Sequence, residues 1–434
     1  VGSSLSKLIL RRHTEKAFKQ VAEQEGQQKG ISQLDFLKSY HEILSKDIRQ
    51  SDFKASTDNE TGRLFTAFVD ASTFEESLRT FGALKESCNA EKDCNLFELL
   101  KDETSDNVRA KVLWTLLTKR MKQPEYKCNN MDKCRVLVAG AGPAGLRTAI
   151  ESAMLGAHVV VLEKRRKFSR NNLLHLWPSS IRDFKNIGAK YFYGKFCTGG
   201  INHIAIRQLQ LLLTKIALIL GVKILHMTSL VGIGEPAYEE KSNCYMWTAK
   251  VDSELENLAP ELLKYNVLVG GDGEGSRVAQ FAEFERKIFQ GSRAIGITCN
   301  FVNTKTKPEQ DIREFGILAI YDQKFFKELK DKYEIELENL VYYRGETHYF
   351  VMTAKKSTLL ARGVCRENLA DDQGLLSSAN VDRVQLEELV RVVATHVGLP
   401  ETCKFSLASK GGFNDVAVFD FSKKKQAKQP FLVL

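Results

Sequence analysis

The sequence predicts an α/β protein in which an N-terminal helical segment precedes a nucleotide-binding domain with an inserted mixed or antiparallel β-sheet domain. Apolar residues first recur at intervals of three and four residues, from about Arg63 to Met121, as amphipathic helices require. The spacing of the apolar residues changes at Cys134, where a short apolar strand ends in glycine. Strand and helix patterns then alternate to about Gln280. Four later stretches read as sheet strands: Ala294–Val302, Gly316–Tyr321, Leu340–Tyr343 and Thr347–Ala354.

Composition indicates a protein of two or three structural units. The chain has 434 residues, 43% of them hydrophobic, and a formal net charge of +9. This modest excess of positive charge favours an acidic partner, or it simply reflects a mildly basic cytosolic protein, and both interpretations stay open. The longest apolar run, 209–222, is interrupted by Gln210, Thr214 and Lys215 and is too short and too polar to span a bilayer. We therefore expect no membrane insertion and a cytoplasmic location.

Cysteine and histidine usage indicates neither a disulfide framework nor a metal site. The nine cysteines are an odd number without a Cys-x-x-Cys pair, and the eight histidines do not cluster with them. Reduced thiols in the cytosol fit this pattern best. We find no nucleic-acid-binding motif, so no nucleic-acid partner is expected.

A dinucleotide-binding fingerprint follows the first strand. Gly140 permits a tight turn, Gly142 lets the backbone approach a pyrophosphate, and Gly145 lets helix and strand pack closely. The helix expected over Leu146–Leu155 would direct its N-terminal amides at the phosphates. A second strand ends on Glu163, which is placed to accept hydrogen bonds from ribose hydroxyls. Strand, helix, strand and terminal acid together predict a Rossmann-like unit.

A second motif distinguishes FAD from NAD. Residues 266–277 form an apolar strand that runs into Asp272 and Gly273. This segment resembles the Asp-Gly fingerprint of flavoprotein hydroxylases of the p-hydroxybenzoate hydroxylase type, where the FAD and NAD(P)H pyrophosphates both approach. A simple tight turn after a strand is the alternative. With the first fingerprint, the motif favours FAD.

Longer stretches resemble a known family, and they lie in order along the chain. They are residues 163–178, 193–199, 203–210, 294–303 and 341–356. They are similar to the flavin monooxygenase domain of the MICAL proteins, over roughly Phe65 to Ser422. The resemblance implies an FAD-dependent, NADPH-consuming monooxygenase that uses O₂, oxidises methionine of actin, promotes filament disassembly and is associated with the cytoskeleton. It adds FAD and NADPH as cofactors and actin as partner.

The resemblance also implies particular site residues. Cofactor contacts are expected at Ala144; at Glu163, Lys164 and Arg165 on the adenosine end; at Arg170, Asn171 and Asn172 on the pyrophosphate or flavin side; and at Leu230, Tyr321 and Asp420. An ordinary core leucine explains Leu230 equally well. Trp177 is a candidate catalytic residue that shapes the flavin face, with a buried core tryptophan as the alternative.

For the remaining candidate site residues, a purely structural role is at least as well supported as a functional one. His175, Tyr343 and His348 are more often core or strand-pair residues than catalysts. Arg182, Lys190 and Lys195 are candidates for receiving NADPH or the acidic surface of actin, although a solvated charged face is the default.

The expected organisation has five zones, and the last departs from the family. They are a helical extension of unknown role (1–60), a helical segment packing on the FAD domain (61–130), the FAD-binding domain (131–285), a β-sheet substrate subdomain (286–375) and a return segment to the FAD domain (376–434). The family pattern has a Gly-Asp motif after the segment equivalent to Phe419–Ser422, and none follows here, so we expect a truncated segment. A catalytically impaired flavin-binding or interaction protein is therefore an alternative function, and a small-molecule aromatic hydroxylase is a third.

Overall fold

The computed structural model describes residues 60–89, 95–127, 131–189, 193–196, 201–240, 243–255, 258–290, 294–370, 372–408, 412–429 and 431–433. They fall into two compact units, one built from the described residues up to Ala71 and from Leu78 to Thr115, the other from Ser72–Ser77 and Leu116 onward. The helical extension expected over residues 1–60 lies, except for Glu60, outside the described residues.

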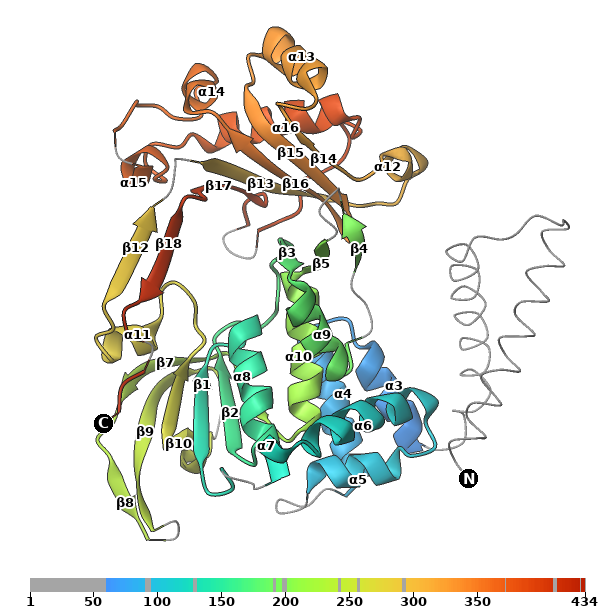
Figure 1. Cartoon of the computed structure of the whole chain (residues 1–434), viewed down its shortest axis with the longest axis vertical. Coiled ribbons are helices and arrows are strands. Elements are labelled where there is room, and N and C mark those ends of the chain that lie inside the picture. Colours follow the sequence, from blue (N-terminus) through green and yellow to red (C-terminus); the bar gives the residue numbers. More distant parts are fainter. Residues whose placement is uncertain are drawn as a thin grey trace, which may run out of the picture. The chain divides into compact units, whose positions relative to one another are not determined.

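The first unit is helical, as the three- and four-residue spacing predicts. It draws on α3 (Glu60–Asp70), α4 (Phe74–Ser87), α5 (Leu96–Glu103) and α6 (Val108–Met121) (Figure 1). Phe65 and Phe68 are fully buried, and the centres of the Phe65 and Trp114 rings lie 5.7 Å apart. The Trp114 indole donates to the Thr104 hydroxyl at 2.9 Å. The short α5, which the spacing did not predict, is N-capped by Asn95.

The second unit contains a four-stranded parallel sheet in the order β11-β1-β2-β6. Its strands are β1 (Arg135–Ala139), β2 (His158–Glu163), β6 (Lys223–His226) and β11 (Val267–Gly270). The crossover helix α8 (Pro143–Met154) lies beside α10 (Ile206–Ile219) in Figure 1. The strand–helix–strand prediction is confirmed, and Gly156 after α8 has the positive φ expected of a C′ residue (+97°).

Smaller elements surround this sheet. Antiparallel β7 (Thr228–Ile233), β8 (Ala237–Glu239), β9 (Cys244–Ser253) and β10 (Lys264–Tyr265) form one additional sheet, and β3 (Leu173–Leu176), β4 (Tyr193–Phe196) and β5 (Ile201–Ala205) form another. The short helices here are α7 (Pro124–Lys127), α9 (Pro178–Asn186), η1 (Pro260–Leu263) and α11 (Arg277–Phe281).

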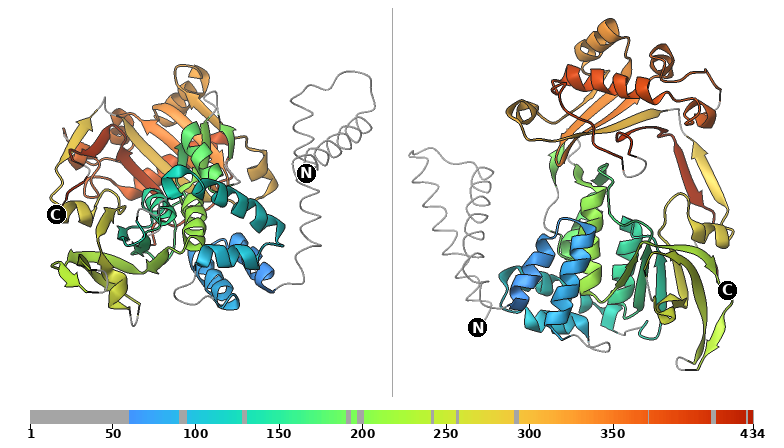
Figure 2. Two further views of the ribbon diagram at one scale, coloured as in Figure 1. Left: turned by 60° about the horizontal axis from the view of Figure 1, so that its bottom comes forward. Right: turned by 180° about the vertical axis from the view of Figure 1, so that it is seen from behind.

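A five-stranded antiparallel sheet in the order β14-β15-β16-β13-β17 forms the inserted domain. Its strands are β13 (Ile295–Val302), β14 (Phe315–Leu318), β15 (Leu337–Arg344), β16 (Thr347–Ala354) and β17 (Val416–Asp420). Helix α16 (Arg383–Val397) crosses one face of it and shares its core (Figure 2, right). The other helices are α12 (Lys307–Asp311), α13 (Gln323–Tyr333), α14 (Lys356–Ala361) and α15 (Asp372–Leu375).

Hydrogen bonding ties the end of the described chain to this domain. β17 pairs with β13, so residues 416–420 lie in the five-stranded sheet of the inserted domain. The sequence predicts residues 376–434 as a return segment to the FAD domain, whereas residues 416–420 belong to the sheet. After Asp420, β18 (Lys423–Ala427) pairs antiparallel with β12 (Arg286–Gln290). Within the described ranges, we find no helix with the length and apolarity that crossing a bilayer demands.

One predicted strand is too long. The strand expected over Gly316–Tyr321 ends at Leu318, because Asp322, four residues later, is the N-cap of a new helix. The Asp322 side chain accepts a hydrogen bond from the Phe325 amide and N-caps α13, and the intervening residues form a turn. The local apolar alternation does not reveal this cap.

Candidate functional site

The glycine loop lies against the turn that follows β11. A Cβ atom at Gly140 would lie 2.6 Å from the Gly271 carbonyl oxygen, and one at Gly142 would lie 3.3 Å from the same atom. Gly140 also has a φ of +99°, which L side chains rarely adopt. A Cβ at Gly145 would collide with the Gly140 carbonyl. The two motifs that the sequence predicts separately therefore form one surface.

Helix α8 presents its first turn without a side-chain cap. Its N-cap is Gly142 and Pro143 occupies the first turn, as the sequence predicts. The N–H groups of a first helical turn have no intrahelical partner, and the helix dipole favours an anion beside them. This end of α8 is suited to a phosphate group.

Asp272 contributes an unsatisfied oxygen beside the loop. Its Oδ2 accepts a hydrogen bond from the Arg277 amide at 2.7 Å, whereas the buried Oδ1 has no hydrogen-bond partner in the described part of the chain. A Cβ atom at Gly140 would lie 2.8 Å from the Cα of Asp272. A buried acceptor without a partner is costly, and a ligand hydroxyl or amide would satisfy it.

Glu163, at the end of β2, is 1% exposed and accepts four hydrogen bonds. Oε2 accepts from the Ala141 amide at 3.0 Å and from Arg165 Nη2 at 2.9 Å. Oε1 accepts from the Arg165 amide at 2.9 Å and from Nε at 2.7 Å. A carboxylate has about four lone-pair sites. A ribose hydroxyl that bonded to Glu163 would therefore take a place now held by Arg165.

The same hydrogen bonds act on Arg165. Its pKa is raised mainly by the hydrogen bond to Glu163, which outweighs the opposing effect of burial. The guanidinium carbon also lies 5.8 Å from the centre of the Phe168 ring. Arg165 is thus held at the end of β2 from two sides.

Gln210 is a site residue that the motif analysis missed. It lies on α10, is 1% exposed, and its amide donates to the Ala141 carbonyl at 2.8 Å. Glu163 holds the N–H of Ala141 and Gln210 holds its carbonyl, so both polar groups of this loop residue are fixed from outside the loop. The available signal was its polarity within the apolar run 209–222.

A cavity of about 1630 Å³ opens beside β11. Arg170, Gly273 and Asp420, three of the predicted cofactor residues, line it together with Ser276 and Trp247. Its volume exceeds that of typical small-ligand pockets, and its lining does not include the glycine loop, Glu163 or Asp272. Arg170 and Asp420, which are far apart in the sequence, thus meet at one cavity.

A smaller pocket lies between β3–β5 and the β15–β16 hairpin, with Asn171, His203, Tyr343 and Tyr349 in its wall. Asn172, beside it, donates to the Tyr349 hydroxyl at 3.4 Å. Burial, with charge repulsion from His175, lowers the pKa of His203 to about 4, so His203 is neutral at pH 7.

His175 also contributes here, because its Nε2 is hydrogen-bonded to the Tyr343 hydroxyl. The three-residue segment 170–172 therefore divides between two pockets: Arg170 lines the larger, and Asn171 lines the smaller.

Several predicted residues lie away from these two cavities. Lys164 and Ala144 are exposed, and Leu230 is buried among core residues that include Leu162. Tyr321 is 81% exposed in the turn after β14, and Trp177 is 71% exposed as the N-cap residue of α9. The alternative of a buried core tryptophan does not apply to Trp177.

The predicted basic residues are only partly described. Arg182 is exposed on α9. Lys190 and the side chain of Lys195 lie outside the described residues.

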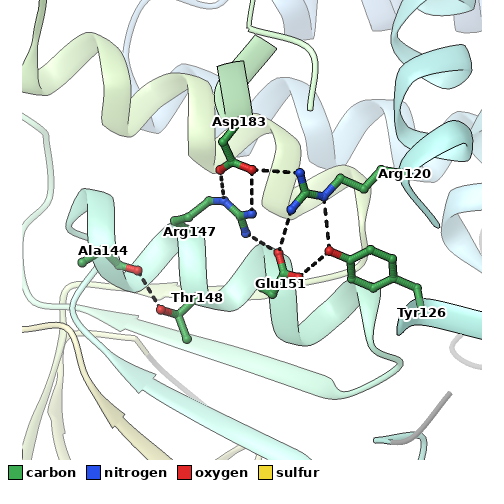
Figure 3. Close-up of polar contacts among 7 residues, drawn as sticks. All are labelled: Arg120, Tyr126, Ala144, Arg147, Thr148, Glu151 and Asp183. Atoms are coloured by element: carbon green, nitrogen blue, oxygen red, sulfur yellow. Dashed lines mark hydrogen bonds and ion pairs between the residues drawn. The ribbon is translucent and has the colours of Figure 1, made fainter. Parts of the chain in front are cut away.

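An ion-pair network behind the loop fixes α8 (Figure 3). Arg147 forms a bidentate pair with Asp183 at 2.7 and 3.1 Å and a second pair with Glu151 at 2.6 Å. Arg120 also contacts Asp183, at 2.8 Å, and Tyr126 donates to Glu151 at 2.5 Å. Burial lowers the pKa of Arg147, but the hydrogen bonds and charges of Asp183 and Glu151 outweigh burial, and the net pKa is raised. The network links α6, α7, α8 and α9.

The residues present therefore fit FAD. The glycines leave room for a pyrophosphate, the uncapped end of α8 favours its charge, and the Asp272 oxygen awaits a donor. Glu163 lies at the end of β2, where a ribose is held in Rossmann-type sites.

Comparison with protein-family models gives two matches. A model described as "Mical, Rossman domain" matches residues 293–420, and a model described as "FAD binding domain" matches residues 133–175. The parallel sheet, the glycine loop and the FAD-binding match define the class of protein: a flavoprotein with a Rossmann-like FAD-binding domain.

Curated relatives narrow the class. The chain is 46% identical over 322 residues to human [F-actin]-monooxygenase MICAL3, covering 72% of this chain and 16% of that protein. It is 42% identical over 384 residues to zebrafish (Danio rerio) [F-actin]-monooxygenase mical1, covering 86% and 30%. Zebrafish protein-methionine sulfoxide oxidase mical3a is 46% identical over 320 residues. Over 72% to 86% of its length the chain is therefore similar to the MICAL proteins, and it spans between a sixth and a third of the length of these relatives.

Solved structures show more distant similarity. Aklavinone-11 hydroxylase with FAD and aklavinone is 15% identical with a TM-score of 0.41, covering 68% of this chain and 55% of that chain. The tetrameric form of 2-methyl-3-hydroxypyridine-5-carboxylic acid oxygenase is 18% identical with a TM-score of 0.38, covering 68% and 72%.

Proposed function

We propose that this chain is an FAD-dependent, NADPH-consuming monooxygenase that oxidises methionine side chains of actin and so promotes filament disassembly. The observation that carries the FAD assignment is the contact between the glycine loop and the Asp272 turn, with Glu163 fixed beside them. The names of the relatives, [F-actin]-monooxygenase and protein-methionine sulfoxide oxidase, support the reaction and the substrate. An actin substrate implies a location at the cytoskeleton.

Bound FAD would supply the redox chemistry, taking electrons from NADPH and activating O₂. The protein binds and orients it. The amides at the start of α8 hold the pyrophosphate, and Glu163 with Arg165 contacts the adenosine end. Arg170 and Asp420, in the wall of the large cavity, hold the remainder of the cofactor. Methionine oxidation converts an apolar side chain into a polar one, which weakens the contacts it makes in a filament.

A three-part experiment tests this function. The full chain is reconstituted with FAD and examined for a protein-bound flavin spectrum. NADPH oxidation is then measured with and without actin filaments, and the actin is analysed by mass spectrometry for methionines that have gained one oxygen atom. We expect bound flavin, actin-stimulated NADPH oxidation and oxidised methionine. A chain that binds no flavin after reconstitution contradicts the proposal.

A second candidate is a catalytically impaired flavin-binding or interaction protein. It is favoured by the segment that follows Asp420, because residues 423–427 form β18 on β12 and do not match the family's Gly-Asp motif. This candidate predicts bound flavin, but NADPH oxidation that stays at background when actin filaments are added.

A further inference from the structure

Three buried side chains meet in the inserted domain, away from the nucleotide site. Glu309 comes from α12, His348 from β16, and Cys403 from the loop after α16. They are 1%, 0% and 7% exposed, and their donor atoms all lie within 4.8 Å of one another. The three residues are far apart in the sequence, so the fold alone brings them together.

The carboxylate of Glu309 is a buried negative charge. Burial raises its pKa, but hydrogen bonds from Cys403 Sγ (3.0 Å), the Thr306 amide (2.8 Å) and the Thr304 hydroxyl (2.9 Å) outweigh burial and lower the pKa to about 2. Within the described residues, only His348 lies within ion-pair distance, at 3.8 Å. Burial lowers the pKa of His348, so it is neutral at pH 7. A buried anion without a cation is expensive.

His348 directs an unsatisfied nitrogen at this carboxylate. Its Nδ1 is hydrogen-bonded to the Tyr342 hydroxyl at 2.8 Å. Its Nε2 has no hydrogen-bond partner among the described residues, since Glu309 Oε1 at 3.8 Å is too distant. In the tautomer whose Nδ1–H donates to the Tyr342 hydroxyl, Nε2 keeps its lone pair, which is the arrangement of a metal-binding histidine.

We propose that Glu309, His348 and Cys403 bind a divalent transition-metal cation, with Zn²⁺ the best match. Zinc takes this combination of carboxylate, imidazole and thiolate, with bonds of about 2.0–2.3 Å, so tetrahedral ligand atoms lie roughly 3.3–3.8 Å apart. The Sγ–Oε1 distance of 3.0 Å and the Nε2–Oε1 distance of 3.8 Å lie close to that range. A water molecule would complete the tetrahedron.

Metal binding would neutralise the site. Burial raises the pKa of Cys403 to about 12, so without metal it is a thiol. Binding breaks the S–H bond, forms a metal–sulfur bond and releases one proton to the buffer. The cation then balances the thiolate and the Glu309 carboxylate. The nearby Arg391 does not compete for this role, because its guanidinium stacks on Phe301 and Phe405 and donates to the Cys403 carbonyl.

The metal would join three parts of the inserted domain. It would connect α12, β16 and the loop that leads from α16 toward β17, the strand that ends in Asp420. Because the metal would bind the folded chain and not the unfolded chain, adding metal should raise the unfolding temperature.

Cobalt is a spectroscopic probe for this site. The full chain is dialysed against chelator under reducing conditions and titrated with Co²⁺. We expect one equivalent per chain to produce a thiolate-to-cobalt charge-transfer band that Zn²⁺ removes. Cys403→Ser should abolish the band. The matched control is Cys365→Ser, another buried cysteine of the same core, whose Sγ donates to the Leu375 carbonyl; it should retain the band. No band in the unmodified chain, or its equal loss in both variants, overturns the proposal.

A second measurement covers the case in which Cys403→Ser does not fold. In the unmodified chain, chelator should lower the unfolding temperature and Zn²⁺ should restore it. Glu309→Gln retains the size of the side chain and the cysteine but removes the charge, and we expect Zn²⁺ affinity to fall at least about tenfold. An unfolding temperature that is insensitive to chelator and to Zn²⁺ overturns the proposal. None of these measurements depends on flavin or on turnover.

Discussion

Glu163 Oε2 accepts a hydrogen bond from the backbone N–H of Ala141 at 3.0 Å, so the acid at the end of β2 holds the glycine loop directly. An acid at this position is expected to contact ribose. Here it also supports the loop that faces the pyrophosphate, and Arg165 fills its remaining acceptor sites. One carboxylate thus connects the two halves of the adenosine-binding region.

Glu163→Gln should weaken FAD binding. The amide keeps the shape of the side chain but loses its charge, so Arg165 loses its ion pair. We expect the Kd for FAD to rise roughly tenfold, equivalent to about 1.4 kcal/mol, in a flavin-fluorescence titration. The control is Glu261→Gln, an exposed ion-pair residue in η1. Equal FAD affinities in the two variants would argue against a role for Glu163.

Gln210→Leu tests the support that α10 gives the loop. The substitution leaves the buried Ala141 carbonyl without its donor, a loss of about 1–3 kcal/mol in the free energy of unfolding. FAD affinity should fall as well. Thr214→Val on the same helix is the control, because the Thr214 hydroxyl is buried and has no partner within the described chain. Denaturant unfolding of both variants measures the difference, and a Gln210→Leu variant as stable as Thr214→Val would refute this role.

Gly142→Ala should separate cofactor binding from folding. The new Cβ would lie 3.3 Å from the Gly271 carbonyl, a tight contact that small shifts relieve, but it enters the space in front of α8 where the pyrophosphate would approach. We expect FAD affinity to fall about tenfold or more, with a modest change in unfolding temperature. Gly275→Ala, where a Cβ meets no atom within 4 Å, should bind FAD normally. Normal FAD binding by Gly142→Ala would place the pyrophosphate elsewhere.

The Arg147–Asp183 pair should appear in the pH dependence of stability. Burial raises the pKa of Asp183, but hydrogen bonds and charge interactions with Arg147 and Arg120 outweigh it, and the net pKa is lowered. The stabilisation is therefore present above the unfolded pKa of about 3.9 and is lost as pH falls through the lower folded value. Asp183→Asn should be less stable at pH 7 and should lose less stability on acidification. Thermal unfolding from pH 7 to 3, with exposed Asp331→Asn as control, measures this; parallel curves for Asp183→Asn and the unmodified chain would exclude it.

Trp177→Ala tests a residue that the structure places on the surface. Because the side chain is 71% exposed, its removal should leave the unfolding temperature nearly unchanged. If it shapes the flavin face during turnover, actin-stimulated NADPH oxidation should fall while FAD affinity is retained. Unchanged turnover would remove Trp177 from the candidate site.

Local patterns were sufficient for the elements around the nucleotide site. The apolar strand before Gly140, the helix behind it and the strand ending in Glu163 all follow from residue periodicity and glycine spacing. These signals are local because φ preferences and the burial of one face act over a few residues. The end of β14 was missed because the Asp322 cap competes with the apolar alternation before it.

Tertiary structure alone decided which distant side chains meet. Gln210 is an unremarkable interruption of an apolar run until α10 brings it to the Ala141 carbonyl. Glu309, His348 and Cys403 have no metal-binding spacing, yet strand pairing and helix packing bring them within 4.8 Å. The nucleotide-binding unit was predictable because its fingerprint glycines and its terminal acid, Glu163, lie within a single strand–helix–strand segment. The support that Gln210 gives to that unit and the buried three-residue cluster depend on contacts between segments far apart in the chain, which no local pattern encodes.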